Sequence, residues 1–167
     1  IKIKKDYIDK EYFKIHEITE LIYNKSLSYN FREEIDRDKE NKISSIFKKM
    51  TIKGKNIKMK DYLNGLDFQN FMIKKVDNIF RNYDFIISPS TSGPAPRRGT
   101  KENKDSCLIW NFLHLPVINV PIFKEKNNLP FGVQIVFPRY KDYQLLDFIS
   151  FLLKKKLIPK KNYPCLN

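Results

Sequence analysis

Two serines lie beside lysines, a pairing in which a lysine could activate a serine as a nucleophile. Ser44 and Ser45 stand between Lys42 and Lys48. A serine hydroxyl becomes a nucleophile when a base takes its proton, and lysine is such a base only when burial lowers its pKa. The neighbouring residues are strongly charged, so nothing there would desolvate a lysine. We interpret these serines as part of a solvated helix face.

A proline-rich loop over 88–99 gathers four more hydroxyl side chains: Ser88, Ser90, Thr91 and Ser92. Hydroxyls in such loops mostly cap turns. Acyl transfer also needs backbone N–H groups aimed at the oxyanion, and glycine-rich loops supply them. Glycine occurs only at 54, 65, 93, 99 and 132, so there is no Gly/Ser-rich cradle. We assign no catalytic residue within this sequence.

The candidates for substrate contact follow the predicted strand ends and open the next helix: Thr91, Asp105, Ser106, Trp110 and Asn111. Trp110 fits a core anchor and a pocket lining equally well. Asp105 fits a helix N-cap better than an acid.

Cysteines and histidines give no metal site. Cys107 and Cys165 have neither CxxC nor Cys/His spacing, and His16 and His114 have no second ligand at a suitable spacing. We expect structural roles for both histidines, no metal and no cofactor. Two cysteines are too few for a disulfide framework, which favours a cytoplasmic location.

The first half of the chain has apolar residues at helical spacing. We expect one or two amphipathic helices over 6–35 and a long helix over 61–82. The charged stretch 32–60 is expected at the surface, with a short helix over 43–49 and a turn at Gly54.

The second half predicts three strands, 84–88, 117–120 and 131–137, with Pro121 closing the second. A helix capped by Asp105 or Ser106 runs to Leu113, and Asp142 caps the last helix. That helix carries an apolar stripe of Leu145, Leu146, Ile149, Leu152 and Leu153. Three strands buried on both faces leave an open edge, so the sheet is incomplete in this chain.

We expect one domain over 1–167, with peripheral helices in 1–60, the sheet and its helices in 61–153, and a tail in 154–167. The chain starts at Ile1 and not at Met, so we expect that preceding residues are missing.

Three ordered strings carry a family resemblance: YDFIISPSTSGPAP, KDSCLIWNFLHLPVINVPIF and LPFGVQIVFPRYKDYQLLDFISFLL. Their order and spacing closely resemble the C-terminal region of the amidase-signature family. The resemblance implies an α/β fold in which helices pack on a mixed β-sheet. The sequence departs from the family pattern at His114, where Gly is frequent, and at Phe137-Pro138, where a Val-Gly pair is frequent.

The resemblance implies hydrolysis of a non-peptide carbon–nitrogen bond by a Ser-Ser-Lys machinery. None of those positions can be carried onto this chain, which we expect to be inactive alone and to complete its pocket with a missing N-terminal half. The substrate would be a small-molecule amide. The A-type subunits of the related glutamyl-tRNA amidotransferases carry a Tyr-rich, Asp-containing segment that is not evident here, so a plain amidase is preferred.

Two rival hypotheses remain. The first is a free-standing, non-catalytic remnant or partner subunit of an amidase or amidotransferase. The second is a basic nucleic-acid-binding module, because the net charge is +13. Only 6 of the 32 basic residues are Arg, which argues against phosphate and base recognition. We therefore expect no nucleic acid and no membrane partner, and a homodimer is a candidate assembly.

Overall fold

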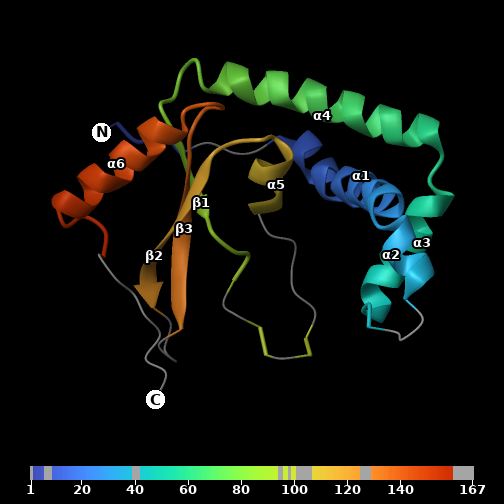
Figure 1. The fold of residues 1–167 in the computed structure, drawn as a ribbon. Helices are drawn as coiled ribbons and strands as arrows, with labels where there is room; N and C mark the ends of the chain where they lie inside the picture. Colours follow the sequence, from blue (N-terminus) through green and yellow to red (C-terminus); the bar gives the residue numbers. More distant parts are fainter. Residues whose placement is uncertain are drawn as a thin grey trace. The chain divides into compact units, whose positions relative to one another are not determined.

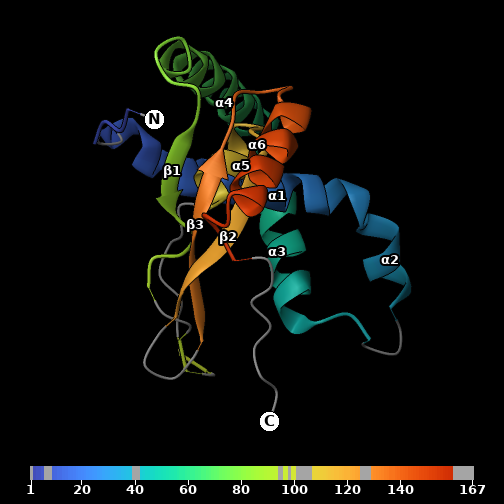
Figure 2. The same cartoon turned by 90° about the vertical axis from the view of Figure 1, so that its left-hand side faces the viewer.

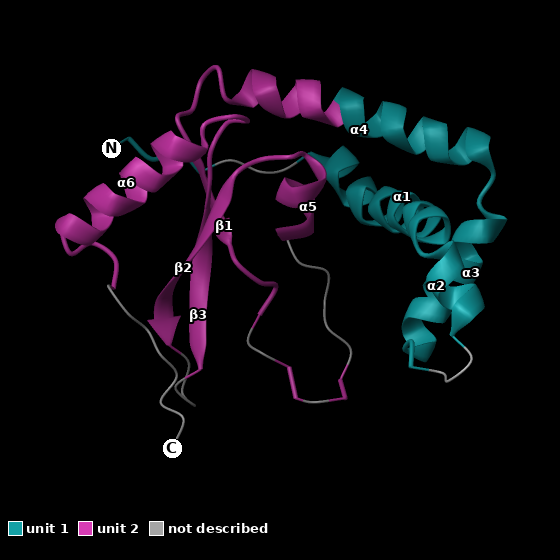
Figure 3. Ribbon diagram, in the orientation of Figure 1, with its two compact units in different colours: residues 1–71 teal, residues 72–167 magenta. Residues whose placement is uncertain are grey.

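A computed structural model describes residues 2–5, 9–38, 42–93, 96–97, 99–100, 107–124 and 129–159. The chain divides into two units, residues 1–71 and 72–167, with the boundary inside one long helix (Figure 3). Each unit is described by itself. The single-domain organisation and its subdivisions stay a prediction.

Unit 1 is helical, as the apolar spacing predicts. It contains the 3-10 helix η1 (Lys10–Lys14), then α1 (Ile15–Asn30), α2 (Arg32–Arg37) and α3 (Ser45–Asn56), and the start of α4 (Met59–Ile79) (Figure 1). Helix α3 begins where the Ser44 hydroxyl accepts a hydrogen bond from the Phe47 N–H at 3.2 Å. This N-cap gives Ser44 a structural role, in line with its interpretation from the sequence.

Gly54 lies inside α3, so the predicted turn at this position is wrong. A Cβ atom on Gly54 would stand 1.8 Å from the carbonyl oxygen of Asn24 and 2.9 Å from the Cβ of Ser28, both in α1. Only a residue without a side chain lets the two helices approach this closely. The helix predicted over 43–49 therefore continues through the glycine to Asn56.

Asp38 joins the end of α2 to the start of α3. Its carboxylate accepts hydrogen bonds from the backbone N–H groups of Lys42 and Ile43 at 2.8 and 3.1 Å, and Lys48 Nζ lies 2.7 Å away. The Lys48 ammonium, helped by the two N–H groups, holds the pKa of Asp38 below its ordinary value of 3.8.

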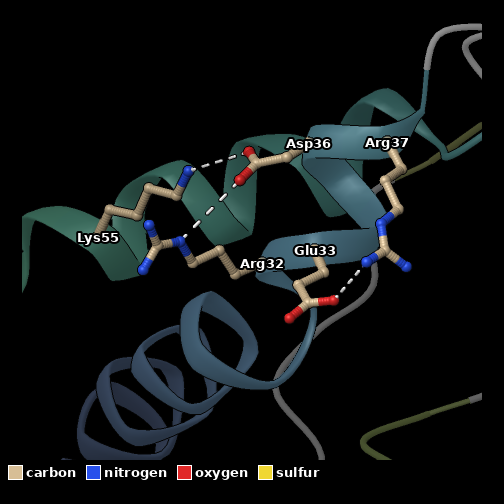
Figure 4. A network of polar contacts seen from close by, with 5 residues as sticks. All are labelled: Arg32, Glu33, Asp36, Arg37 and Lys55. Atoms are coloured by element: carbon tan, nitrogen blue, oxygen red, sulfur yellow. Dashed lines mark hydrogen bonds and ion pairs between the residues drawn. The ribbon is translucent and has the colours of Figure 1, made fainter.

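Exposed ion pairs lie within α2, and one of them extends to Lys55 of α3. Asp36 lies 4.0 Å from Arg32 and 3.9 Å from Lys55, while Arg37 pairs with Glu33 at 2.8 Å (Figure 4). Their side chains are 46 to 80% exposed, so each pair contributes about 0–1 kcal/mol.

Unit 2 is built on three strands: β1 (Ile86–Pro89), β2 (Val117–Lys124) and β3 (Pro130–Val136). Their order is β1-β3-β2, and both pairings are antiparallel. Helix α6 (Asp142–Lys154) lies on one side of the sheet, and α5 (Cys107–Phe112) lies on the other (Figures 1 and 2). This helix-flanked sheet is the predicted α/β arrangement. The parallel pairings of a mixed sheet are not among the described strands.

The core of unit 2 lies between the sheet and α6. Val120, Ile135 and Phe137 pack there with Leu145 and Leu152, all at most 8% exposed. The predicted stripe on α6 is half right, because Leu146 and Leu153 are 54 and 37% exposed. Asp142 is the first helical residue, so the N-cap position falls on Lys141 and the predicted cap is wrong.

Strand β2 continues past Pro121, so the predicted strand end at this proline is also wrong. A register shift between Val120 and Phe123 forms a β-bulge, which accommodates a residue that cannot donate to the ladder. A Cβ atom on Gly132 of β3 would stand 2.5 Å from the Val120 carbonyl oxygen. Glycine at 132 therefore lets β3 approach the bulge.

Asp77 and Arg139 tie the last turns of α4 to the segment after β3. The guanidinium Nε donates to one carboxylate oxygen of Asp77 at 3.2 Å, and Nη2 donates to the other. This hydrogen-bonded carboxylate raises the pKa of Arg139 above its ordinary value. A bidentate pair fixes orientation as well as distance.

Gly54→Ala should lower the free energy of unfolding by about 1–3 kcal/mol, because the added methyl group collides with the backbone of α1. Gly65→Ala is the matched control. Its Cβ would meet side-chain atoms and no backbone, Ile22 at 3.2 Å and both Ile18 and Leu21 at 3.5 Å. The gain in helix propensity is worth about 1 kcal/mol. Urea unfolding compares the two variants. Equal losses would show that Gly54 is not required by the close helix approach.

Asp38→Asn should destabilise the chain at neutral pH. Since the folded-state pKa is lowered, the carboxylate stabilises the fold fully above the ordinary value of 3.8, and this contribution is lost as the pH falls through the folded-state pKa. The difference in unfolding free energy between wild type and variant should therefore shrink on acidification, measured by denaturant unfolding at several pH values. Asp36→Asn is the control, because it removes exposed ion pairs only and should change the free energy of unfolding at neutral pH by at most about 1 kcal/mol.

Candidate functional site

The end of β1 is held to β3 by one carbonyl group. The Gly132 carbonyl accepts hydrogen bonds from both the N–H and the hydroxyl of Ser90, at 3.0 and 2.9 Å. Ser90 is 6% exposed, so its hydroxyl is committed to this contact. The start of the proline-rich loop is thus anchored to the sheet.

Trp110 in α5 is 2% exposed, and its indole Nε1 donates to the Ser88 hydroxyl oxygen at 3.0 Å. Ser88 in β1 is itself 8% exposed. A buried indole N–H needs such a partner, and this bond fixes α5 against the sheet. The environment of Trp110 is that of a core anchor, one of the two roles expected from the sequence.

Three polar residues cross the sheet side by side: Ser88 in β1, Gln134 in β3 and Asn119 in β2. Gln134 is the register partner of both others. Since side chains alternate along a strand and Ile135 faces α6, this polar row faces the side that carries α5. Ser88 and Gln134 are buried, whereas Asn119 is exposed.

Among the residues that the structure describes, none is a hydrogen-bond partner of the Gln134 side-chain oxygen, although Gln134 is only 7% exposed. An unpaired buried polar group costs about 1–3 kcal/mol. Sequence reasoning gave Gln134 no function. The signal was a glutamine inside an otherwise apolar strand, at a buried position.

Two of the other expected contact residues, Thr91 and Asn111, do not belong to this row. Thr91 is exposed, and its hydroxyl donates to the Gly93 carbonyl at 2.6 Å, a local turn contact. Asn111 is exposed on α5. Asp105 and Ser106 lie outside the described residues, as does the expected N-cap of α5. The substrate-binding role of these residues stays a prediction.

Among the described residues, no group of three or more His, Cys, Asp or Glu side chains could hold a metal ion. His114 has φ of 56° and follows the last turn of α5. There the Leu115 N–H bonds the Trp110 carbonyl and the His114 N–H bonds the Asn111 carbonyl, both at 3.1 Å. These bonds make a Schellman motif, whose left-handed residue is usually glycine. This explains physically why the family pattern has Gly where this chain has His114.

A pocket of about 490 Å³ lies at the opposite end of β1 from Ser90. Its lining is mainly aromatic: Phe80, Tyr83, Asp84, Phe85, Phe137, Pro138, Gln144 and Phe148. It includes none of the residues expected to contact substrate. In the described part of the chain no helix is both long and apolar enough to cross a membrane.

Comparison with solved proteins identifies the fold as that of the amidase-signature enzymes. A solved amidase superposes with a TM-score of 0.76 at 17% identity, covering 89% of this chain and 37% of that protein. A structure described as a vestigial protein complex, which reveals the origins of an s-triazine catabolic enzyme, gives 0.76 at 19% identity, with 91 and 36% covered.

The chain belongs to the amidase family, whose family model matches residues 6–146. A curated relative, the A-type subunit of the glutamyl-tRNA(Gln) amidotransferase of Brachyspira hyodysenteriae, is 30% identical over 101 residues, which is 55% of this chain and 21% of that protein. The chain thus spans about a fifth of this relative's length. Amide hydrolysis or a related family role is the activity class that these comparisons support.

Ser88→Ala should lower the free energy of unfolding by about 1–3 kcal/mol, because it leaves the buried indole N–H of Trp110 without a partner. Thr91→Ala is the control. It removes only an exposed turn contact and should change stability by less than about 0.5 kcal/mol. The double variant Ser88→Ala/Trp110→Phe should lose less stability than the sum of the two single losses, since Trp110→Phe removes the orphaned donor. Additive losses in this double-mutant cycle would refute the coupling.

Proposed function

We propose that this chain works as part of a larger amidase-family enzyme that hydrolyses a non-peptide amide bond, with the Ser-Ser-Lys machinery outside this chain. Family membership over residues 6–146 carries the proposal. The described hydroxyls support it in a second way. Ser44 caps α3, while Ser88 and Ser90 are buried in contacts with Trp110 and Gly132, so these three already have structural partners.

In this enzyme the chain supplies one wall of the substrate pocket. The wall is formed by the end of β1 and by α5, with Thr91, Asp105, Ser106, Trp110 and Asn111 as its substrate-contacting residues. Trp110 acts from the buried side by holding α5 against Ser88. The substrate is a small-molecule amide that needs no cofactor, and the enzyme works in the cytoplasm.

A second candidate role is that of a subunit without its own catalytic centre. Two observations favour it: the relative from Brachyspira hyodysenteriae is named as a subunit of an amidotransferase, and one structural neighbour is described as a vestigial protein complex. In this role the chain would complete the fold of a catalytic partner. A homodimer is a further candidate assembly.

Amide hydrolysis tests the proposal directly. The purified chain is assayed beside a longer chain that includes any coding sequence preceding Ile1, with a panel of aliphatic and aromatic amides and release of ammonia or amine as the readout. Turnover by the longer chain alone is the expected result. Turnover by the short chain would contradict the proposal, and alanine variants of Ser88, Ser90 and Ser92 would then locate its nucleophile.

A further inference from the structure

The unpaired oxygen of Gln134 is the starting point. Its amide is buried in the middle strand of the sheet, yet Oε1 has no partner among the described residues. Buried amides in folded proteins are nearly always paired, so an orphan in a central strand indicates a contact that the described residues do not make.

The neighbours of Gln134 define what that contact could be. Ser88 Oγ accepts the indole N–H of Trp110, which leaves the hydroxyl hydrogen of Ser88 available to an acceptor. Asn119, on the other side of Gln134, has an exposed amide. The polar row therefore offers a hydroxyl donor, an amide oxygen and an exposed amide in line across the sheet, which suits a peptide group with its N–H and C=O.

The polar row is not an ordinary solvated sheet face. A water-facing glutamine would be exposed, whereas Gln134 is 7% exposed and Val136, next on the same face, is fully buried. Ser88 is 8% exposed, whereas Asn119 is exposed. The row is thus closed at its Ser88 end and open at its Asn119 end.

We infer that Gln134 accepts a hydrogen bond from a backbone N–H of an amidase-family segment outside this chain, which docks over the polar row at Asn119. The solved amidase of the same fold is longer: this chain covers 37% of it, so such a segment has a source. The inference rests on the proposed function, and it makes Gln134 a positioning residue that holds the segment against the pocket wall.

The Gln134→Met substitution tests the inference when it is made both in this chain alone and in the longer chain. Methionine keeps the length and shape of glutamine but cannot accept the hydrogen bond. In this chain alone, the folding equilibrium constant should stay within threefold of wild type or rise, because no partner is lost. In the longer chain it should fall about tenfold or more. A similar change in both contexts would overturn the inference.

Gln144→Met is the matched control. Gln144 is an exposed residue of α6, so the same chemical change should leave the folding equilibrium constant of both the short and the longer chain unchanged. Gln134→Glu provides a conservative variant, because its neutral carboxyl still accepts an N–H through the C=O oxygen. In the longer chain this variant should keep most of the wild-type stability at low pH and lose it as the pH rises and the buried carboxyl ionises, whereas Gln134→Met should show no such pH dependence.

Amide turnover by the longer chain separates this inference from the proposed function. If wild type turns over amides, Gln134→Met should lower kcat about tenfold and change KM less than threefold, since the residue positions a segment and does not touch substrate. Unchanged kcat would overturn the inference and leave the proposed function standing. If wild type turns over no amide, the proposed function fails, and the stability comparison between the two contexts still decides whether Gln134 has an external partner.

Discussion

The pairing of β3 with both other strands is the constraint on which unit 2 depends. β3 supplies every inter-strand partner of β1 and β2 in the described sheet, and its Gly132 carbonyl fixes the exit of β1 through Ser90. One face of β3 packs on α6, and the other carries Gln134 toward the α5 side. A shift of one residue in β3 would exchange the two faces and place the amide in the apolar core.

Most elements could be predicted from the sequence because their signals are local. The helical period over 6–35 and 61–82, and the apolar runs before Pro89 and after Pro116, correspond to the observed helices and strands. The errors at Gly54 and Pro121 have a shared cause. Each residue is usually a breaker of regular structure, and each is tolerated here through a tertiary feature, a close helix approach or a bulge, that no local pattern reveals.

The candidate site was predictable only in part. Trp110 was expected to be a core anchor or a pocket lining, but its partner Ser88 lies 22 residues earlier, and nothing local pairs the two. Gln134 was not singled out from the sequence, because the lack of a described partner is a property of the packed molecule. Thr91 and Asn111 are exposed, so packing neither assigns nor removes a role for them.

The two edges of the described sheet are shaped in a way that bears on solubility. β1 is four residues long and ends in Pro89, while β2 is interrupted by Pro121 at its bulge. A proline has no N–H to offer, so a foreign strand would find short and interrupted ladders at either edge. These prolines oppose open-ended strand addition and so protect an edge-exposed sheet, which includes the exposed Ile87, from fibrillar self-association.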